Sequence, residues 1–357
     1  MTYDIAIVGA GMAGASLAAA IGPRARVVLI EAEDMPGRHA TGRSAAFWSE
    51  SYGGPAVQPL TTASGPYLHD GGYLNPLGSL HVGRVEDGAR IDRFLADFAH
   101  TGVDLSRADP APFVPGLRPQ WVQGIWEPSC AYIDVAALHA DYLAAARAAG
   151  AVLMTDAALL SAERCDGTWR LETRAGPVRA TLLVDAAGAW ADEVARMAGA
   201  APVGITPYRR TMVQLRVDPP APEGLPHVID ISGGFYFKPE PGGRLWLSPH
   251  DETPSIACDI APEEWDVAVA IDRLERVVDW RVEAVERRWA GLRSFAPDRA
   301  PVYGFDARVP GFFWCAGQGG FGIQTAPAAS VLAAALLLGE GPVPDGVDAA
   351  RYAAARF

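Results

Sequence analysis

A glycine-rich segment near the start of the chain has the residue types and the spacing that bind a dinucleotide. Residues 9–14 read GAGMAG, which matches G-x-G-x-x-G, and an acidic residue ends the next apolar run. In this motif the first glycine makes a tight turn, the second lets the backbone approach a pyrophosphate, and the third lets the helix pack on the strand. The helix amino terminus stabilises phosphate charge, and the acid accepts hydrogen bonds from ribose hydroxyls. The motif predicts a dinucleotide site formed by Gly9, Ala10, Gly11, Gly14 and Glu31, with a purely structural glycine turn as the alternative.

A second glycine-rich segment near the end of the chain narrows the choice of cofactor. Residues 317–322 read GQGGFG and come shortly before an Ala/Leu-rich helical run. Backbone N–H groups at the start of a helix suit another electron-rich group, such as the pyrimidine edge of a reduced flavin. Because an extended FAD would touch both ends of the chain, the two segments together favour FAD over NAD.

The elements that must position these segments alternate between two kinds of structure. Residues 3–8 and 26–31 are apolar strand-like runs that flank a helix of small residues, which is a βαβ unit. Further parallel α/β signals lie at 134–200 and 300–340, with antiparallel strand signals between them. The predicted fold class is α/β plus α+β, in which a Rossmann-type FAD-binding domain is interleaved with an antiparallel-sheet substrate-binding domain. The predicted boundaries are 1–48, 134–207 and 290–357 for the first domain, and 49–133 and 208–289 for the second. The ligand is expected at their interface.

Composition excludes several classes of partner. The net charge is −12 over 357 residues, and such an acidic surface disfavours nucleic acid. The four cysteines include no C-x-x-C pair and no zinc-like spacing, which predicts a reduced, cytoplasmic protein without a metal site. The amino terminus lacks the pattern of a signal peptide. The longest apolar run, residues 326–338, is too short to span a bilayer and predicts a packed helix.

Five segments together resemble the D-amino-acid oxidase superfamily of FAD-dependent oxidoreductases, and the resemblance covers nearly the whole chain. These segments read VGAGMAGAS, GRHATGRSAA, VDAAGAWAD, WAGLRSFAPD and AGQGGFGIQT. The combination of GRSAA, GLRSF–APD and GGFGIQT is most similar to the D-arginine dehydrogenase branch. Because GLRSF contains no cysteine for a covalent flavin link, and because His39 is not expected to be a tether, the resemblance implies non-covalent FAD.

The resemblance also implies cofactor contacts beyond the first motif. Arg43, Ser44, Ala45 and Ala46 would approach the flavin ring, Ala158 would lie near the adenine, and Ala187 and Gly188 would close over the ribityl chain. The pyrimidine end would be bound by Gly319, Gly320, Gly322, Ile323, Gln324 and Thr325.

A further implication of the resemblance is a carboxylate site formed by Tyr52, Arg210, Tyr236 and Arg293. Arginine offers a planar fork that suits a carboxylate. The alternation of residues 207–217 places Arg210 on the opposite face from Arg209, so only one of the two can point into the site. Arg293 has apolar neighbours, and a buried arginine needs an anion. The alternatives are a surface charge for Arg210, a structural carboxylate partner for Arg293, and packed aromatics for the tyrosines.

Two positions depart from the D-arginine pattern, a third keeps it, and together they shape the expected substrate. Ser79 stands where that branch has a glutamate for the guanidinium, Phe47 replaces an active-site histidine, and Ser49 keeps a hydroxyl group. Loss of the carboxylate predicts a small neutral or apolar amino acid. The expected reaction is oxidation of a D-amino acid to the imino acid by hydride transfer to flavin N5, followed by hydrolysis to a 2-oxo acid and ammonia. The electron acceptor, O2 or another compound, stays open.

Other functions remain open at this stage. The nearest rivals are a glycine or secondary-amine (sarcosine-like) oxidase and a 2-hydroxyacid dehydrogenase of the same superfamily. A non-catalytic flavin-binding subunit is an alternative of a different class, which the pair Arg210 and Arg293 disfavours.

Overall fold

The chain begins with a βαβ unit whose close packing depends on two glycines. A computed structural model describes residues 2–357, and strand β1 (Tyr3–Val8), helix α1 (Met12–Ile21) and strand β2 (Val27–Ile30) follow one another at its start. Gly9 has a φ of +99°, and a Cβ atom there would lie 2.5 Å from the carbonyl oxygen of Ala186. A Cβ atom on Gly14 would lie 1.9 Å from the carbonyl oxygen of Gly9. The turn and the helix–strand contact predicted from the glycine spacing are therefore present.

The first sheet is mainly parallel and gathers strands from three distant parts of the sequence. Its order is β10-β11-β12-β1-β2-β9, with β20 beside the end of β12 and β19 beside β20. The remaining strands of this sheet are β9 (Val152–Met154), β10 (Leu159–Cys165), β11 (Thr168–Thr173), β12 (Gly176–Asp185), β19 (Val302–Phe305) and β20 (Phe312–Ala316). Strands β12, β1, β2, β9 and β20 run parallel, whereas β10, β11 and β19 pair in the antiparallel sense.

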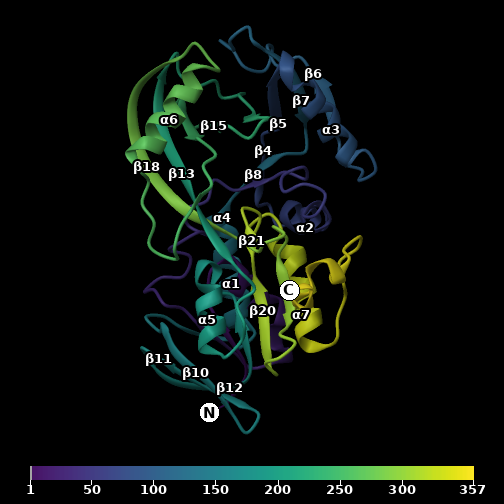
Figure 1. Ribbon diagram of the computed structural model, residues 1–357, viewed down its shortest axis with the longest axis vertical. Helices are drawn as coiled ribbons and strands as arrows, with labels where there is room; N and C mark the ends of the chain where they lie inside the picture. Colours follow the sequence, from purple (N-terminus) through teal and green to yellow (C-terminus); the bar gives the residue numbers. More distant parts are fainter. Residues whose placement is uncertain (1) are drawn as a thin grey trace.

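Helices cover both faces of this sheet because its central strand buries alternate side chains on opposite sides. Ile5 and Ile7 pack in one cluster with Leu17 of α1 and Leu332 of α7, whereas Ala6 packs in a second cluster with residues of α5. This alternation is the period of two expected of a strand buried on both faces. The helices of this half are α2 (Gln58–Asp70), α4 (Val135–Ala148), α5 (Ala191–Met197) and α7 (Ala326–Leu338), with single 3-10 turns at Gly22–Arg24, Gly188–Trp190, Ala349–Tyr352 and Ala354–Arg356. They occupy the lower half of Figure 1.

The second sheet is larger, mostly antiparallel and strongly curved. Its order is β21-β18-β13-β16-β15-β14-β5-β7-β6, and β17 pairs with β13. Its strands are β5 (Ser79–Arg84), β6 (Ser106–Ala108), β7 (Trp121–Glu127), β13 (Thr206–Asp218), β14 (His227–Asp230), β15 (Tyr236–Glu240), β16 (Arg244–Ser248), β17 (Thr253–Pro254), β18 (Arg281–Phe295) and β21 (Gln318–Gly319). In Figure 1 the long strands β13 and β18 run from the upper part of the molecule toward the lower part.

The two faces of the second sheet differ in chemistry. One face carries Val213, Leu215 and Leu247, which pack in one apolar cluster with Val267 and Leu274 of helix α6 (Glu264–Glu275). The other face carries the polar residues described below. Helix α3 (Gly88–Phe98) follows β5 after a 3-10 turn at Val85–Asp87. A third, small sheet has the strand order β3 (Phe47–Trp48), β8 (Ala131–Ile133) and β4 (Leu74–Pro76).

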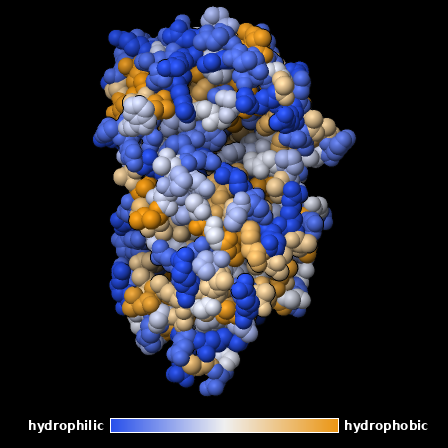
Figure 2. Space-filling view, viewed as in Figure 1, coloured by the Kyte–Doolittle hydropathy of each residue, from blue (hydrophilic) through white to orange (hydrophobic). Residues whose placement is uncertain are grey.

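The expected fold class is confirmed: a Rossmann-type half and an antiparallel half are interleaved along the chain. The predicted boundaries at 207/208 and 289/290 fall within β13 and β18, so these strands run on without a break there. Hydrophilic side chains cover most of the upper end of the face seen in Figure 2, and hydrophobic ones form small scattered groups.

Helix α2 and strand β18 are among the elements that have no counterpart in the sequence prediction. Helix α2 contains Gly65 and Pro66, residues that disfavour a helix interior, and β18 opens with a run rich in Glu and Arg. Helix α2 forms because Leu60, Ser64 and Leu68 are buried. Strand β18 forms because nearly its whole length pairs with β13. Tertiary contacts outweigh local propensity in both cases.

Gly14→Ala should destabilise the protein because its new methyl group would overlap the backbone of Gly9. We expect the free energy of unfolding to fall by about 3 kcal/mol, as for an overpacked core site. Gly88→Ala is the matched control, since a Cβ atom there finds its nearest neighbour at 3.6 Å. It should leave stability unchanged or raise it by about 0.5–1 kcal/mol. Urea unfolding of both variants measures this, and equal stabilities would contradict the packing argument.

Candidate active site

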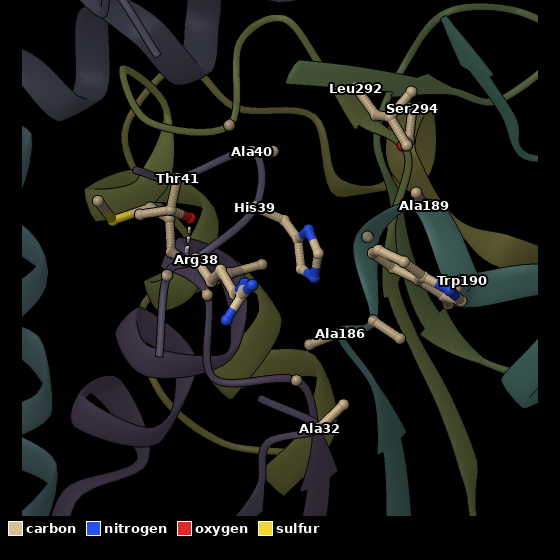
Figure 3. Close-up of a pocket in the computed structure, with 18 of the residues that line it drawn as sticks. Ala32, Arg38, His39, Ala40, Thr41, Ala186, Ala189, Trp190, Leu292 and Ser294 are labelled. Carbon is tan, nitrogen blue, oxygen red and sulfur yellow. Dashed lines mark hydrogen bonds between the residues drawn. The ribbon is translucent and has the colours of Figure 1, made fainter. Parts of the chain in front are cut away.

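A long cavity of about 380 Å³ lies where the ends of the first sheet meet the second sheet. Its walls come from three stretches of the sequence, residues 8–44, 158–197 and 258–323. Figure 3 shows Arg38, His39, Ala40 and Thr41 on one side, facing Ala186, Ala189, Trp190, Leu292 and Ser294 on the other. We call this the first cavity.

The amino terminus of α1 opens onto the first cavity with the properties of an anion site. Gly11, the residue before the helix, provides no side-chain cap, and the first turn of α1 contains no acidic residue. The N–H of Met12 donates to Thr41 Oγ1 at 3.0 Å. A side chain at Gly9 would collide with the backbone of Ala186, so this position must be glycine and its backbone stays open to the cavity. A positively polarised helix end without an acidic cap, beside a glycine turn, fits a diphosphate.

Glu31 lies at the end of β2 and also lines the first cavity. Its Oε2 accepts from the N–H of Ala10 at 3.0 Å, and its Oε1 accepts from the N–H of Glu33 at 3.0 Å. Two backbone donors fix the carboxylate in place, and each oxygen keeps a further lone pair for a hydroxyl group. The carboxylate is thus positioned to bind a ribose, as the motif predicts.

Most of the predicted cofactor residues are brought together in the first cavity. Those that line it are Gly9, Gly11, Glu31, Arg43, Ser44, Ala158, Ala187, Gly188, Gly319, Gly320, Gly322 and Ile323. Ala45, Ala46 and Gln324 line a neighbouring cavity instead. Ala10, Gly14 and Thr325 line neither. Ala10 and Gly14 are buried in the βαβ turn, and the Thr325 hydroxyl donates to the carbonyl of Phe321 at 2.9 Å.

Two side chains in the first cavity are already engaged with the protein. The Arg43 guanidinium donates to the carbonyl of Ile260 at 3.0 Å and pairs with Asp259. The His39 ring bonds Glu33 at 2.8 Å and lies 4.7 Å from the Trp190 ring, between centroids. These contacts tie the 38–43 segment to the opposite wall of the cavity.

A second cavity of about 310 Å³ adjoins the first, and four residues line both. They are Ser44, Arg293, Gly320 and Ile323. The second cavity extends along the polar face of the second sheet toward β14 and α3. Its volume lies within the range of pockets that bind small molecules.

Arg293, at the junction of the two cavities, is a buried cation without an anion. Only 7% of its surface is exposed. Among residues 2–357 its Nε has no hydrogen-bond partner and its guanidinium forms no ion pair. Burial, and then the nearby Arg210, lower the pKa of Arg293. Because an unpaired buried charge is costly, this position favours a bound anion.

Arg210 and Arg293 share one face of the β13–β18 ladder. Tyr208 is opposite Arg293 and Arg210 is opposite Gly291, so both arginines point away from α6. Arg209 points the other way and pairs with Asp266 at 2.8 Å. Arg210 is 2% exposed and donates to the carbonyl of Asp251 at 2.9 Å and to Glu252 at 3.2 Å. Unlike Arg293, it already has a carboxylate partner.

The two predicted tyrosines both line the second cavity. The Tyr52 ring packs edge-on against Phe321, with centroids 5.0 Å apart. Tyr236 lies beneath the Arg210 guanidinium, whose Cζ is 6.0 Å from the ring centroid. Three of the four residues predicted for the carboxylate site, Tyr52, Tyr236 and Arg293, thus line the second cavity, whereas Arg210 lies against Tyr236 and lines neither cavity.

Three histidines in the second cavity were missed by the sequence prediction. His81, His227 and His250 come from different strands and loops, and none belongs to a local motif. Burial first, and then Arg210, lower the pKa of His250 to about 3. Its Nδ1 lies 3.0 Å from the carbonyl oxygen of Gly233, which can only accept, so Nδ1 carries the proton. The histidine is therefore neutral and its tautomer is fixed.

The three positions compared with the D-arginine pattern have distinct surroundings. Phe47 lines the second cavity and stacks on His227 with centroids 3.7 Å apart. Ser49 also lines it, but its hydroxyl donates to Glu127 at 2.9 Å. Ser79 is fully buried in β5 and, in the part of the chain that the structure describes, is not among the lining residues.

Glu127 is a buried carboxylate that holds the segment leading to Tyr52. It accepts from the hydroxyls of Ser49 and Ser51 at 2.9 and 2.5 Å and from the N–H of Glu50 at 2.7 Å. Burial by itself would raise the pKa of Glu127, but the His81 ring and the two serine hydroxyls outweigh it and hold that pKa below its ordinary value of 4.5. The residue fixes one wall of the second cavity.

Together, the Rossmann unit, the glycine-lined first cavity and the adjoining second cavity define a dinucleotide-dependent enzyme. Comparison with known proteins agrees with this class. The sequence profile of the FAD dependent oxidoreductase (DAO) family matches residues 4–336, and the chain belongs to this family. FAD is its cofactor.

Several relatives and solved structures are similar to this chain. Human mitochondrial dimethylglycine dehydrogenase is 34% identical over 126 residues, which is 34% of this chain and 14% of that protein. The bifunctional protein ThiO/ThiG of Nostoc is 25% identical over 95% of this chain and 53% of its own length. This chain thus spans from a seventh to about half of these relatives. A glycine oxidase structure from Geobacillus kaustophilus, at 23% identity, covers 100% of this chain and 99% of its own with a TM-score of 0.85, which shows the fold.

Residues 2–357 contain no cluster of three or more His, Cys, Asp or Glu side chains placed to hold a metal ion. No helix in this range has the length and apolar character needed to cross a bilayer.

Glu127→Gln should lower the free energy of unfolding most at neutral pH. The amide would place N–H groups against the donors that now bind a carboxylate, so we expect a loss of about 2–3 kcal/mol at pH 7. Because the folded pKa of Glu127 is lowered, its stabilisation is present above about pH 4.5 and is lost as the pH falls through the folded pKa. The difference in the free energy of unfolding between wild type and variant should therefore shrink in acid.

Urea unfolding from pH 7 to pH 3 measures this difference, with the exposed Glu86→Gln as control. A difference that does not change with pH would refute the assignment.

Proposed function

We propose that this FAD-dependent oxidoreductase oxidises the Cα–N bond of a small α-amino acid, and that the substrate is a D-amino acid with a neutral or apolar side chain. The observation that carries the proposal is Arg293, a buried guanidinium without an anion at the junction of the two cavities. A carboxylate of the substrate would supply the anion that the Arg293 guanidinium lacks. When bound, FAD supplies the acceptor for the two electrons and the hydrogen released from the substrate.

The roles of the surrounding residues follow from their contacts. Arg293 would bind the carboxylate directly. Arg210, already paired with Glu252, would add positive potential, and Tyr236 lies against it. Tyr52 and Gly320 would close the wall between the two cavities. Fixing the carboxylate at this junction holds the Cα–H near the first cavity, and such positioning lowers the barrier by several kcal/mol.

The expected preference for an uncharged side chain is supported by the charges around the second cavity. Arg293 and Arg210 make this end positive, and the neutral His250 adds no charge of its own. A cationic side chain would be repelled, and Ser79 supplies no carboxylate for it. Two carboxylates line the rest of the cavity: Asp97 lies at the exposed rim, where water screens its charge, and the buried Asp230 accepts from the N–H and hydroxyl of Ser232 and from the N–H of Gly234.

A glycine or secondary-amine oxidase is the second candidate. The similarity to dimethylglycine dehydrogenase and the shared fold with glycine oxidase favour it. Such a substrate would use the same arginine and the same junction, and would leave much of the second cavity to water.

The first experiment is anaerobic reduction of the FAD-loaded protein. Loss of the flavin colour with D-amino acids alone would support the D-amino acid assignment. Reduction by glycine, N-methylglycine or dimethylglycine alone would move the function to the second candidate, and reduction by 2-hydroxy acids alone would overturn both. If FAD binds and none of these compounds reduces it, the chain does not oxidise amino acids on its own. Admitting air to the reduced protein then separates an oxidase from a dehydrogenase.

Arg293→Met should weaken substrate binding without releasing FAD. Loss of a charge-assisted carboxylate contact corresponds to about 1.5–3 kcal/mol, so the apparent Kd in the reductive half-reaction should rise about 10- to 150-fold. Arg288→Met, on the same strand but exposed and paired with Glu264, should change little. Stopped-flow reduction measures both variants. An unchanged Kd in Arg293→Met would remove the basis of the proposal.

A further inference from the structure

His227 is a buried polar side chain with no partner for either ring nitrogen. It begins β14, only 5% of its surface is exposed, and it lines the second cavity. Among residues 2–357, neither Nδ1 nor Nε2 has a hydrogen-bond partner. An unsatisfied buried polar group is uncommon in folded proteins and calls for an explanation.

The surroundings keep the His227 ring neutral and fixed. One face stacks on Phe47 at 3.7 Å, and the Tyr236 ring meets it edge-on at 5.5 Å. Burial first, and then the nearby His81, Lys238 and His250, hold the pKa of His227 well below its ordinary value. A neutral imidazole offers one N–H donor and one nitrogen acceptor. The ring is therefore held in place with both capacities unused.

The position of His227 relative to Arg293 indicates what it would contact. Arg293 lines both cavities, whereas His227 lines only the second. A substrate whose carboxylate lies at Arg293 has its reacting carbon near the junction. Its side chain must then extend into the second cavity, along the wall that His227 and Phe47 form.

We infer that His227 is a specificity-determining residue that selects a substrate side chain carrying an uncharged hydrogen-bonding group, a hydroxyl or a carboxamide. This inference rests on the proposed function and specifies which neutral side chains the amino-acid substrate would carry. An apolar side chain would leave both ring nitrogens unsatisfied. A cationic side chain would be repelled by Arg293 of the same cavity and by Lys238 near His227. A site built to hydrogen-bond its substrate discriminates strongly against the isostere that lacks the polar group.

Two pairs of ligands of nearly equal shape test this inference. Asparagine and leucine serve as substrates, each as the enantiomer that reduces the flavin. Succinamate and 4-methylpentanoate are their achiral analogues without the amine, so their binding needs no turnover. Binding of the analogues to the FAD-loaded protein is followed by the change in flavin absorbance. Wild type should prefer the amide in both pairs.

Three variants separate recognition from a merely structural role. In His227→Phe the preference for amide over alkyl should fall about tenfold, the effect of one lost hydrogen bond of 1.4 kcal/mol. His227→Gln keeps a donor and an acceptor and should retain most of the preference. His69→Phe, at a site with an 82% exposed side chain, should match wild type. FAD affinity should be the same in all of them.

The outcomes distinguish this inference from the proposed function. If the analogues show the amide preference and its loss in His227→Phe, the inference stands even when no amino acid reduces the flavin. If amino acids reduce it but His227→Phe keeps the wild-type preference, the inference is wrong and the proposed function is unaffected. An alkyl preference in wild type, or equal losses in His227→Phe and His227→Gln, would also overturn it.

Discussion

The pairing of β13 with β18 is the constraint on which the candidate active site depends. The two strands run together along nearly their whole length, and their register irregularities lie between Gln214 and Val217, away from the arginine end. Unbroken register at the other end fixes Arg210 and Arg293 on one face at a constant offset. A slip of β13 by one residue would turn Arg210 toward α6 and would place Arg209 on the face of Arg293 instead. The geometry of the site thus follows from backbone hydrogen bonds, before any ligand is present.

Charge pairing on the two sides of this ladder is unequal. Arg209 is surrounded by Asp251, Glu263 and Asp266 on the side of α6, so its charge is compensated within the protein. Arg210 shares Glu252 with Arg299. Arg293, between the two cavities, has no such partner in the described chain. Three neighbouring arginines therefore differ in what they can do: one is structural, one sets the local potential, and one is available to an anion.

Sequence patterns were sufficient to predict those parts of the site whose residues are neighbours in the sequence. The glycine motif predicts the turn at Gly9 and the contact at Gly14, and strand alternation separates Arg210 from Arg209, because in each case the residues are neighbours in sequence. His81, Glu127 and His227 could not be found this way. They come together through the strand order β14-β5-β7, in which His227 and Glu127 each lie opposite Ser79. A parallel pairing between segments so far apart in sequence leaves no local signal.

The shared wall of the two cavities has a thermodynamic consequence. Ser44, Arg293, Gly320 and Ile323 contribute surface to both, so an occupant of one cavity changes the shape and the dielectric of the other. Binding free energies at two such sites are coupled, and the coupling is reciprocal: whatever factor FAD contributes to the affinity for a carboxylate, the carboxylate returns to the affinity for FAD. On the proposed function, retention of the cofactor would therefore depend on the concentration of small carboxylates around the protein.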